Sequence, residues 1–461
     1  MLTGNGLSYL VIPVLALWIQ APAVVAATLV GGPMAGLPTD EQARIWLMTD
    51  TPARVEVEYW PAEEPRARAR SAPVRTHAAK GHAAKVLLKA LVPDTNYRYQ
   101  VVMDGTPLDG EPELSFSTQP APGTLVRDVL IATGSCANIP DAPQERRGAW
   151  TSGDGYEIFD RIARMKPDLM LWLGDNIYYR DADLEADAGA RMNARWAASR
   201  TFAPLRSLLR TGGHLAIWDD HDYGPDNSDR TFALKEISLA LFQRYWVNGG
   251  FGLPDAPGVF SKASLADLDL FLLDDRYYRD ADASPPFPEM TMLGARQLEW
   301  LKTELRRSTA SFKIVANGSR MLTERPSPTS RGGEGWHNFP RERAAFLDWL
   351  RTERIDGLFF LSGDIHYTHL TQRERPGTYP LTELTCSPLT SRVHPRPFPV
   401  TEVPGTLVAQ RNFCTLEASG PSGGRVLGIS SRDEKGALLW REELAAKDLR
   451  TPRPSSGGEA R

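Results

Sequence analysis

The stretch "WDDHDYGPDNSD" at residues 218–229 carries the densest set of chemically active side chains in this sequence. Five aspartates share it with one histidine, and these residues are Asp219, Asp220, His221, Asp222, Asp226 and Asp229. Carboxylates at this spacing repel one another and raise each other's pKa unless positive charge neutralises them. A pair of metal ions would supply that charge, so the stretch indicates a metal site.

Five further apolar runs also end in side chains that can bind a metal ion or a phosphate group. These side chains are Cys136, Asn138, Asp175, Asn176, Tyr178, Asp274, Asp275, Arg276, Asn317, Arg320, Asp364 and His366. In open α/β sheets, ligands bind beyond the carboxyl ends of the strands, so the clusters can converge on one site. Each cluster alone has a structural interpretation, because Asp often caps a turn. Together they favour function, because so many buried polar groups would be costly in a domain that only had to pack.

The elements that must position these residues are buried strands alternating with amphipathic helices. "DVLIA", "DLMLWL", "HLAIW", "DLFLL", "FKIVA" and "GLFFL" are typical of buried strands. Helical spacing of apolar residues predicts helices in "GYEIFDRIARM", "GARQLEWLKTEL" and "RERAAFLDWLR". We therefore predict a layered α/β domain over residues 126–446 and a disordered tail over residues 447–461.

The N-terminal part of the chain has a different texture. Residues 28–120 contain short alternating segments such as "ARVEVEYWP" and "NYRYQVVMDG", which predict a small all-β immunoglobulin or fibronectin III-like sandwich. Residues 1–27 hold an apolar core followed by small residues, which is typical of a signal peptide. A transmembrane anchor is the alternative, although Pro13 and Pro22 interrupt the run. We expect an exported protein, periplasmic or secreted, with no transmembrane span after signal removal.

Composition excludes several classes of protein. The 461 residues carry 53 basic and 57 acidic side chains, and this net charge of −4 predicts no specific nucleic-acid partner. The three cysteines are too few for a disulfide scaffold, although Cys386 and Cys414 could pair in an oxidising compartment. The sequence has no P-loop, H-E-x-x-H helix or dinucleotide fingerprint. We expect a monomer.

Five motifs, in chain order, resemble the alkaline phosphatase D (PhoD-like) family of calcineurin-like metallophosphoesterases. They are "GSCAN", "GDNIYYRD", "IWDDHDYGPDNSD", "LLDDRYYRD" and "FLSGDIHYTHL". The N-terminal immunoglobulin-like module with an export signal is also similar to that family's organisation. The resemblance implies a layered αββα metallophosphoesterase sandwich preceded by the small β domain.

The resemblance also implies a set of metal ligands. Cys136 and the phenolate of Tyr178 match iron ligands, and Asp175 matches the carboxylate that bridges the metals. Asp220 occupies the position of a metal-binding Asn in the wider superfamily, although Asp219 could be the ligand instead. Asp364 and His366 match late metal ligands. The implied cofactors are iron and calcium, with other divalent metals possible. Donor chemistry supports a mixed set, because thiolate, phenolate and imidazole suit a transition metal whereas carboxylates suit calcium.

The remaining site residues are expected to face the substrate. By the same resemblance, His221 contacts the phosphate and Asp222 orients it. Arg276 is a candidate clamp on a phosphate oxygen, since its guanidinium matches phosphate geometry, and a structural ion pair is the alternative. Three amides are candidate substrate-binding groups, namely Asn138, Asn176 and Asn317.

The sequence thus predicts a phosphate ester hydrolase that uses metal-activated hydroxide, as a monoesterase, a diesterase or both. The first alternative is a phosphodiesterase of wall polymer, lipid or nucleic acid. The second is a metal-containing module that binds phosphate or polymer without catalysis. The segments 182–213 and 323–342, interpreted as polar loops, would decide how large a substrate fits.

Overall fold

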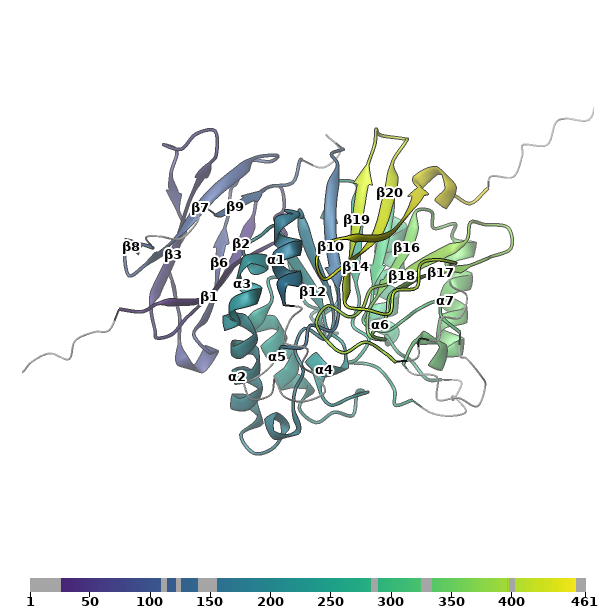
Figure 1. The fold of residues 1–461 in the computed structure, drawn as a ribbon, viewed down its shortest axis with the longest axis horizontal. Coiled ribbons are helices and arrows are strands. Elements are labelled where there is room, and N and C mark those ends of the chain that lie inside the picture. The colour runs from purple at the N-terminus through teal and green to yellow at the C-terminus, as the bar shows by residue number, and fades with distance from the viewer. Residues whose placement is uncertain are drawn as a thin grey trace, which may run out of the picture.

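The computed structural model describes residues 26–108, 114–121, 126–139, 156–282, 289–324, 334–395, 397 and 403–452. A β-rich N-terminal part lies beside a larger α/β part that contains two sheets (Figure 1). The predicted signal peptide falls almost entirely outside the described residues. Among the residues described, no helix is long and apolar enough to cross a membrane.

The N-terminal part is built from strands on two sheets. Strands β3 (Arg54–Pro61), β4 (Ala69–Arg70), β5 (Val74–Arg75), β7 (Asn96–Met103), β8 (Thr106–Pro107) and β9 (Leu114–Ser117) form one sheet. Strands β1 (Leu29–Gly36), β2 (Ala43–Thr49) and β6 (Ala83–Leu88) face it, and the 3-10 turn η1 (Ala78–Lys80) precedes β6. Alternating side chains such as Val55, Val57, Tyr97 and Tyr99 fill the space between them. The predicted small β domain is therefore present.

A nine-stranded sheet forms the first layer of the α/β part. Its order is β21-β20-β19-β10-β11-β12-β1-β2-β6, in which β10 (Val129–Gly134), β11 (Leu169–Leu173) and β12 (Gly213–Ile217) are parallel. Strands β19 (Asn412–Ser419), β20 (Val426–Asp433) and β21 (Leu438–Ala445) continue it as antiparallel neighbours. At the other edge, β1 pairs with β12 through Ala35–Gly213 and Gly36–His214. The N-terminal strands therefore extend the central sheet, which we did not predict.

A six-stranded sheet forms the second layer. Its order is β13 (Ser261–Leu265), β14 (Leu268–Leu272), β15 (Phe312–Ala316), β16 (Leu358–Ser362), β18 (Leu381–Thr385) and β17 (His369–Arg373). Strand β11 shows how a layered core follows from sequence, because both of its faces are apolar. Leu169, Leu171 and Leu173 join the core with the second sheet, whereas Met170 and Trp172 pack with the helices on the opposite face.

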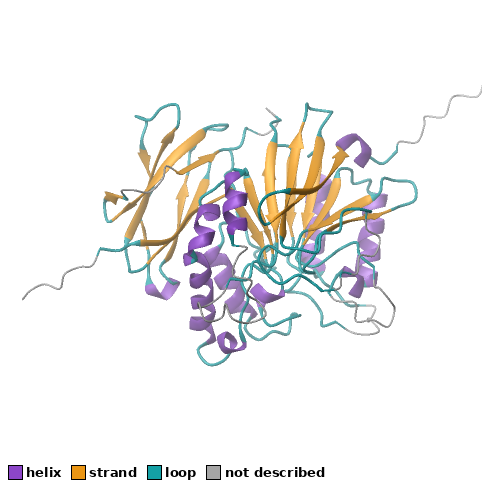
Figure 2. Ribbon diagram, viewed as in Figure 1, coloured by secondary structure: helices purple, strands orange, loops and turns teal. Residues whose placement is uncertain are grey.

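Helices cover both outer faces of the paired sheets (Figure 2). On the first sheet lie α1 (Glu157–Arg164), α2 (Ala188–Thr201), α3 (Arg206–Leu209) and α5 (Lys235–Tyr245), with the turns η3 (Asp181–Leu184) and η4 (Ala203–Leu205). On the second lie α6 (Ala295–Arg307) and α7 (Pro340–Thr352). The short segment α4 (Asp220–Tyr223) contacts α5, and η5 (Trp336–Asn338) contacts α7. The order of layers is αββα, as predicted.

Two details differ from the sequence-based expectations. The segment 182–213, interpreted as a loop, contains α2, whose Met192 and Trp196 are buried against α5 and the sheet. The predicted tail at 447–461 begins inside the turn η6 (Ala446–Leu449), where Leu449 is buried and its carbonyl accepts the N–H of Gly357 at 2.8 Å. Apolar side chains therefore anchor α2 and the turn η6 to the rest of the protein.

Candidate metal centre

The ends of four central strands bring most of the predicted ligands together. The turns after β10, β11 and β16 carry Cys136, Asp175, Asp364 and His366, and all four residues have positive φ, between 52° and 72°. The left-handed region is unfavourable for side chains other than Gly and is enriched at functional sites. The fourth turn, after β12, leads directly into the short helix α4. The strand ends therefore converge as the doubly buried strands predicted.

Cys136, Asp175 and His366 form the first group of potential ligands. Their donor atoms lie within 4.8 Å of one another. Cys136 is a free, buried cysteine whose Sγ lies 3.6 Å from Asp175 Oδ2. The Tyr178 hydroxyl donates to the same Oδ2 at 3.1 Å. Sulfur, phenol oxygen, imidazole nitrogen and carboxylate therefore surround one point.

Asp175, Asp220 and His221 form a second group, and Asp175 is common to both. One Asp175 oxygen, Oδ2, faces Cys136 and Tyr178, whereas Oδ1 accepts the His221 N–H at 3.3 Å. Asp220 is held by the N–H groups of His221 at 2.9 Å and Asn227 at 2.7 Å. A carboxylate shared between two ligand groups can offer one oxygen to each of two metal ions.

A third group, Asp219, Asp220 and Glu334, lies deeper in the molecule, and all three residues are buried. Arg276 already lies among them, where it forms ion pairs with Asp219 and, through both guanidinium N–H₂ groups, with Glu334. This group therefore contains a cation from the chain itself, unlike the other two.

Burial makes the ionised forms of Asp175, Asp364 and Cys136 unfavourable. Burial, followed by repulsion from Asp220, raises the pKa of Asp175 well above its usual value. Burial and the charges of Glu334 and Asp220 do the same to the pKa of Asp364. Burial also raises the pKa of the Cys136 thiol to about 12. A bound metal ion would reverse this by holding the acids and the thiol ionised.

The donor set fits metal ions of two kinds. Cys136, Tyr178, His366 and Asp175 offer the sulfur, nitrogen and oxygen donors that a transition metal prefers. On the other side of Asp175, Asp220 contributes carboxylate oxygen suited to a hard cation. Asp364, which is partly exposed, belongs to none of the three groups among the described residues, although its backbone carbonyl lies 3.3 Å from Cys136 Sγ. Its place as a ligand remains a prediction.

Asp222 has different partners from those we expected. Its carboxylate is fully buried and accepts the N–H groups of Asn176, Ile177 and Asp219 at 2.9–3.2 Å. The side chain of His221 instead lies 3.6 Å from the exposed Asp226, measured from Nε2 to Oδ1. Asp222 therefore fixes the turns that carry Asp175 and Asp219 rather than the imidazole of His221. The turn after β11 supplies two of these donors, the N–H groups of Asn176 and Ile177.

Arg276 has no N–H left for a phosphate. It is fully buried, and its donors are engaged by Asp219, Glu334, the Ser228 carbonyl and the Ser319 hydroxyl. Of the two interpretations weighed from the sequence, this geometry supports the structural ion pair. The ion-pair partners are Asp219 and Glu334, whereas Asp274 accepts hydrogen bonds from backbone N–H groups and from the Trp218 indole.

The three candidate amides lie in different settings. Asn176 is buried, and its Nδ2 donates to the Ile217 carbonyl and to Asp222. Asn317 is also buried, and its Nδ2 donates to the Ser319 carbonyl at 2.6 Å. Asn138 is partly buried, beside Arg180 at 3.4 Å. The structure does not bring the amides to one point, so substrate binding by them stays a prediction.

Two residues of the centre, Glu334 and Ser387, were not predicted from the sequence. Glu334 lies in "RGGEGW", where neither periodicity nor a preceding strand marks it. Ser387 follows Cys386, and its hydroxyl lies 3.1 Å from Cys136 Sγ. Its signal was weak, because a serine beside a cysteine suggests a disulfide neighbourhood and not a metal centre.

Comparison with known proteins places the chain beside a described family. The family model "PhoD-like phosphatase" matches residues 257–412, and a "Domain of unknown function (DUF7800)" matches residues 26–121. Alkaline phosphatase D of Bacillus subtilis (strain 168) is 24% identical over 327 residues, which cover 62% of this chain and 53% of that protein. The chain thus spans about half the length of that curated relative.

Solved structures share the fold over nearly the whole chain. A structure described as that of PhoD superposes with a TM-score of 0.73 at 17% identity and covers 94% of this chain and 92% of that one. A purple acid phosphatase, PPD1 from yellow lupin (Lupinus luteus) seeds, gives 0.64 at 13% identity and covers 94% and 78%. The predicted resemblance to PhoD-like phosphatases is confirmed, and the layered fold is the one that these two solved structures share.

Proposed function

We propose that this PhoD-like chain is a metal-dependent phosphoesterase with iron and calcium as its cofactors. The observation that carries the proposal is Asp175, whose two oxygens face two different groups of ligands. The first group, with Cys136, Tyr178 and His366, would hold iron. The second group, with Asp220, would hold calcium.

When bound, such a metal pair lowers the pKa of water toward neutrality and polarises a phosphoryl oxygen. The side chains of the protein position the reacting groups, and His221 is the candidate proton donor. Asp175 and Asp220 hold the backbone of His221, whose imidazole is about a quarter exposed and lies 4.3 Å from the Tyr178 ring. From this open side, His221 can donate a hydrogen bond to the phosphoryl group or protonate the departing oxygen.

The exposed carboxylate of Asp226 supports this role for His221. It lies 3.6 Å from Nε2, on the exposed side of the imidazole. The deeper residues act differently. Arg276 forms ion pairs with both Asp219 and Glu334, and so it helps to hold the turn after β12 that carries Asp220.

The ester preference separates the proposal from its alternatives. Purified protein supplied with iron and calcium is compared on an aryl phosphate monoester and on the matching diester, with chelator-treated protein as the control. A metal-dependent excess on the monoester would establish a phosphatase, and an excess on the diester a phosphodiesterase. If neither is cut at any pH by protein that holds metal, the chain is a binding module and the proposal fails.

Export is part of the same proposal. It rests on the apolar segment and small residues at 1–27. We expect the chain in the periplasm or the medium, with its N-terminus at about residue 27 or 28. N-terminal sequencing of protein from each cell fraction tests this, and uncleaved chain confined to the cytoplasm would contradict it.

A further inference from the structure

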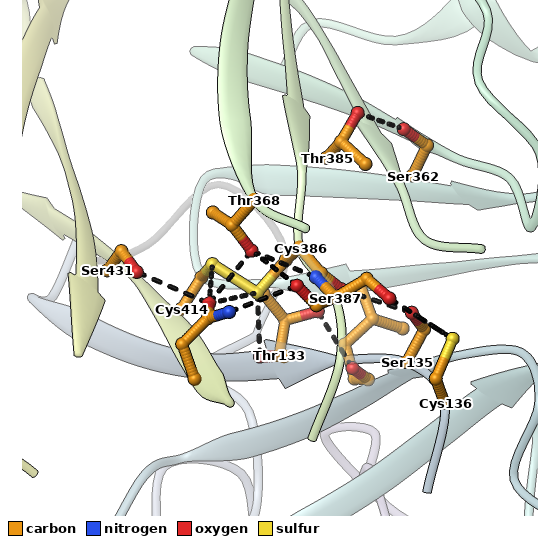
Figure 3. Close-up of a disulfide and its surroundings, with 12 residues drawn as sticks. Thr133, Ser135, Cys136, Ser362, Thr368, Thr385, Cys386, Ser387, Cys414 and Ser431 are labelled. Carbon is orange, nitrogen blue, oxygen red and sulfur yellow. Dashed lines mark hydrogen bonds between the residues drawn. A yellow bond between two sulfur atoms is a disulfide. The ribbon is translucent and has the colours of Figure 1, made fainter. Parts of the chain in front are cut away.

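The segment that follows β18 runs directly behind the proposed iron ligand Cys136 (Figure 3). It begins with Cys386, which forms a disulfide with Cys414 of β19. The next residue, Ser387, is fully buried. Its hydroxyl lies 3.1 Å from the sulfur of Cys136, although the two residues are 251 positions apart in the chain.

The hydrogen bonds of Ser387 settle which atom receives its proton. The hydroxyl oxygen accepts the N–H of His366 at 3.1 Å, which leaves its own hydrogen for Cys136 Sγ. Ser135 also lies 3.2 Å from that sulfur, but its hydroxyl has a second acceptor in the Cys386 carbonyl at 3.2 Å. Ser387 is therefore the dedicated donor to the sulfur, and it links Cys136 to His366.

The surroundings hold Ser387 in this position from both sides. Its N–H donates to the Thr368 hydroxyl at 2.9 Å, and its carbonyl accepts from Asn412 Nδ2 at 3.0 Å. The disulfide fixes the preceding residue to β19. A small polar side chain that is this firmly placed can serve as a rigid support for a metal ligand.

We propose that Ser387 is the positioning residue of the Cys136 thiolate: it fixes the direction of Sγ and lowers the electron density that the sulfur offers to iron. This inference rests on the proposed function, in which Cys136 binds iron. A thiolate that loses a hydrogen-bond donor becomes a stronger electron donor, and a metal ligand that loses its support binds less well, typically by 10–100-fold.

The test uses the visible absorption of the full chain titrated with ferric iron, where a thiolate ligand gives a charge-transfer band. Ser387→Ala should move this band to longer wavelength and raise the half-saturating iron concentration by about tenfold. Ser387→Thr, which keeps the hydroxyl, should restore both. The matched control is Ser431→Ala, because Ser431 is equally buried near the disulfide but donates to Asn412 at 3.3 Å.

Each outcome decides the question. If folded Ser387→Ala has the band and affinity of Ser431→Ala, the proposal is overturned. If Ser387→Ala does not fold, the variants Ser387→Thr and Ser387→Val, which match in shape and differ in the hydroxyl, make the same comparison. Wild-type protein that binds iron with no thiolate band would contradict the role of Cys136 itself. Wild-type protein that binds no iron would instead overturn the proposed function.

Discussion

Single acidic residues in this protein are neutralised in two different ways. Asp219 and Glu334 are buried against Arg276, and Arg279 lies 3.7 Å from Glu334, so two cations of the chain face these two carboxylates. Asp175 is buried beside Asp220 and Cys136, and no ion pair from the described residues reaches it. Asp175 can therefore bind a metal ion, whereas Arg276 already occupies the position beside Asp219 and Glu334.

The role of His221 gives a prediction at this scale. In His221→Ala the ligands of the iron group remain, so we expect near-normal iron content with turnover reduced by about 10²- to 10⁴-fold, the usual range for a lost acid–base group. Metal analysis and steady-state rates on the same sample measure both. Loss of iron together with activity would show that His221 supports the metals.

Substitution of Arg276 is predicted to lower the stability of the protein. Arg276→Met leaves the buried Asp219 without its cation and Glu334 with only Arg279 at 3.7 Å, which should lower the free energy of unfolding by about 3–5 kcal/mol. Urea unfolding measures this, with Arg296→Met as the control, because Arg296 pairs with Asp255 at the surface. Unchanged stability with a raised KM would instead restore Arg276 as a phosphate clamp.

For single residues, the sequence identified candidate ligands better than it identified their hydrogen-bond and ion-pair partners. Cys136, Asp175, Tyr178, Asp220 and His366 were found because each follows a strand, and parallel strands end at one edge. Glu334 and Ser387 were missed because nothing local marks them, and their contacts depend on the tertiary fold.

Among the elements, the turns after β11 and β12 cross closely. Gly174 has φ +93°, and a Cβ there would lie 2.7 Å from the Asp219 Cβ and 2.9 Å from the Asp219 backbone nitrogen. Only glycine allows both this conformation and this approach. The close packing of the two turns that carry Asp175 and Asp220 therefore depends on glycine at position 174.

Gly174→Ala tests this crossing. We expect a loss of about 1–3 kcal/mol from backbone strain, a further loss from the clash, and weaker metal binding. Gly105→Ala is the matched control, since Gly105 has φ +90° but nothing within 4 Å of a Cβ. Thermal unfolding of both variants compares them. Equal losses would mean that the close approach is unimportant.

Elements with clear periodicity were predicted well. The six buried strands and the helices α1, α6 and α7 lie where the apolar spacing placed them. Helix α2 was missed because its sequence, "AGARMNARWAASRT", is rich in alanine and arginine and buries few large side chains. Such a helix is defined by its neighbours more than by its own pattern.

On the scale of the whole molecule, the two parts share a sheet and a core. Met34 and Trp46 of the N-terminal strands pack in one cluster with Trp172 and Phe242 of the α/β part. The indole N–H of Trp46 donates to the Arg244 carbonyl at 3.0 Å, across 198 residues. The shared sheet was not predictable from the sequence, because nothing in the pattern of β1 shows that it pairs with β12 rather than only with strands of the N-terminal part.

The shared core predicts cooperative unfolding. We expect calorimetry of the metal-free protein to give a single transition that includes both parts, because neither buries its surface fully without the other. Trp46→Ala should lower the stability of the whole chain by about 3–5 kcal/mol. Two well-separated transitions, with only the first shifted by the substitution, would show independent domains.

The most direct test of the bridged metal centre is the Asp175→Asn variant, with iron content and turnover measured on one preparation. An amide cannot offer two anionic oxygens to two cations, so we predict loss of bound iron and loss of metal-dependent ester hydrolysis together. Asp255→Asn, at the exposed Arg296 ion pair, should match the wild type in both. If Asp175→Asn keeps its iron and a near-normal rate, the shared carboxylate does not bridge two metals, and the account of the centre is wrong.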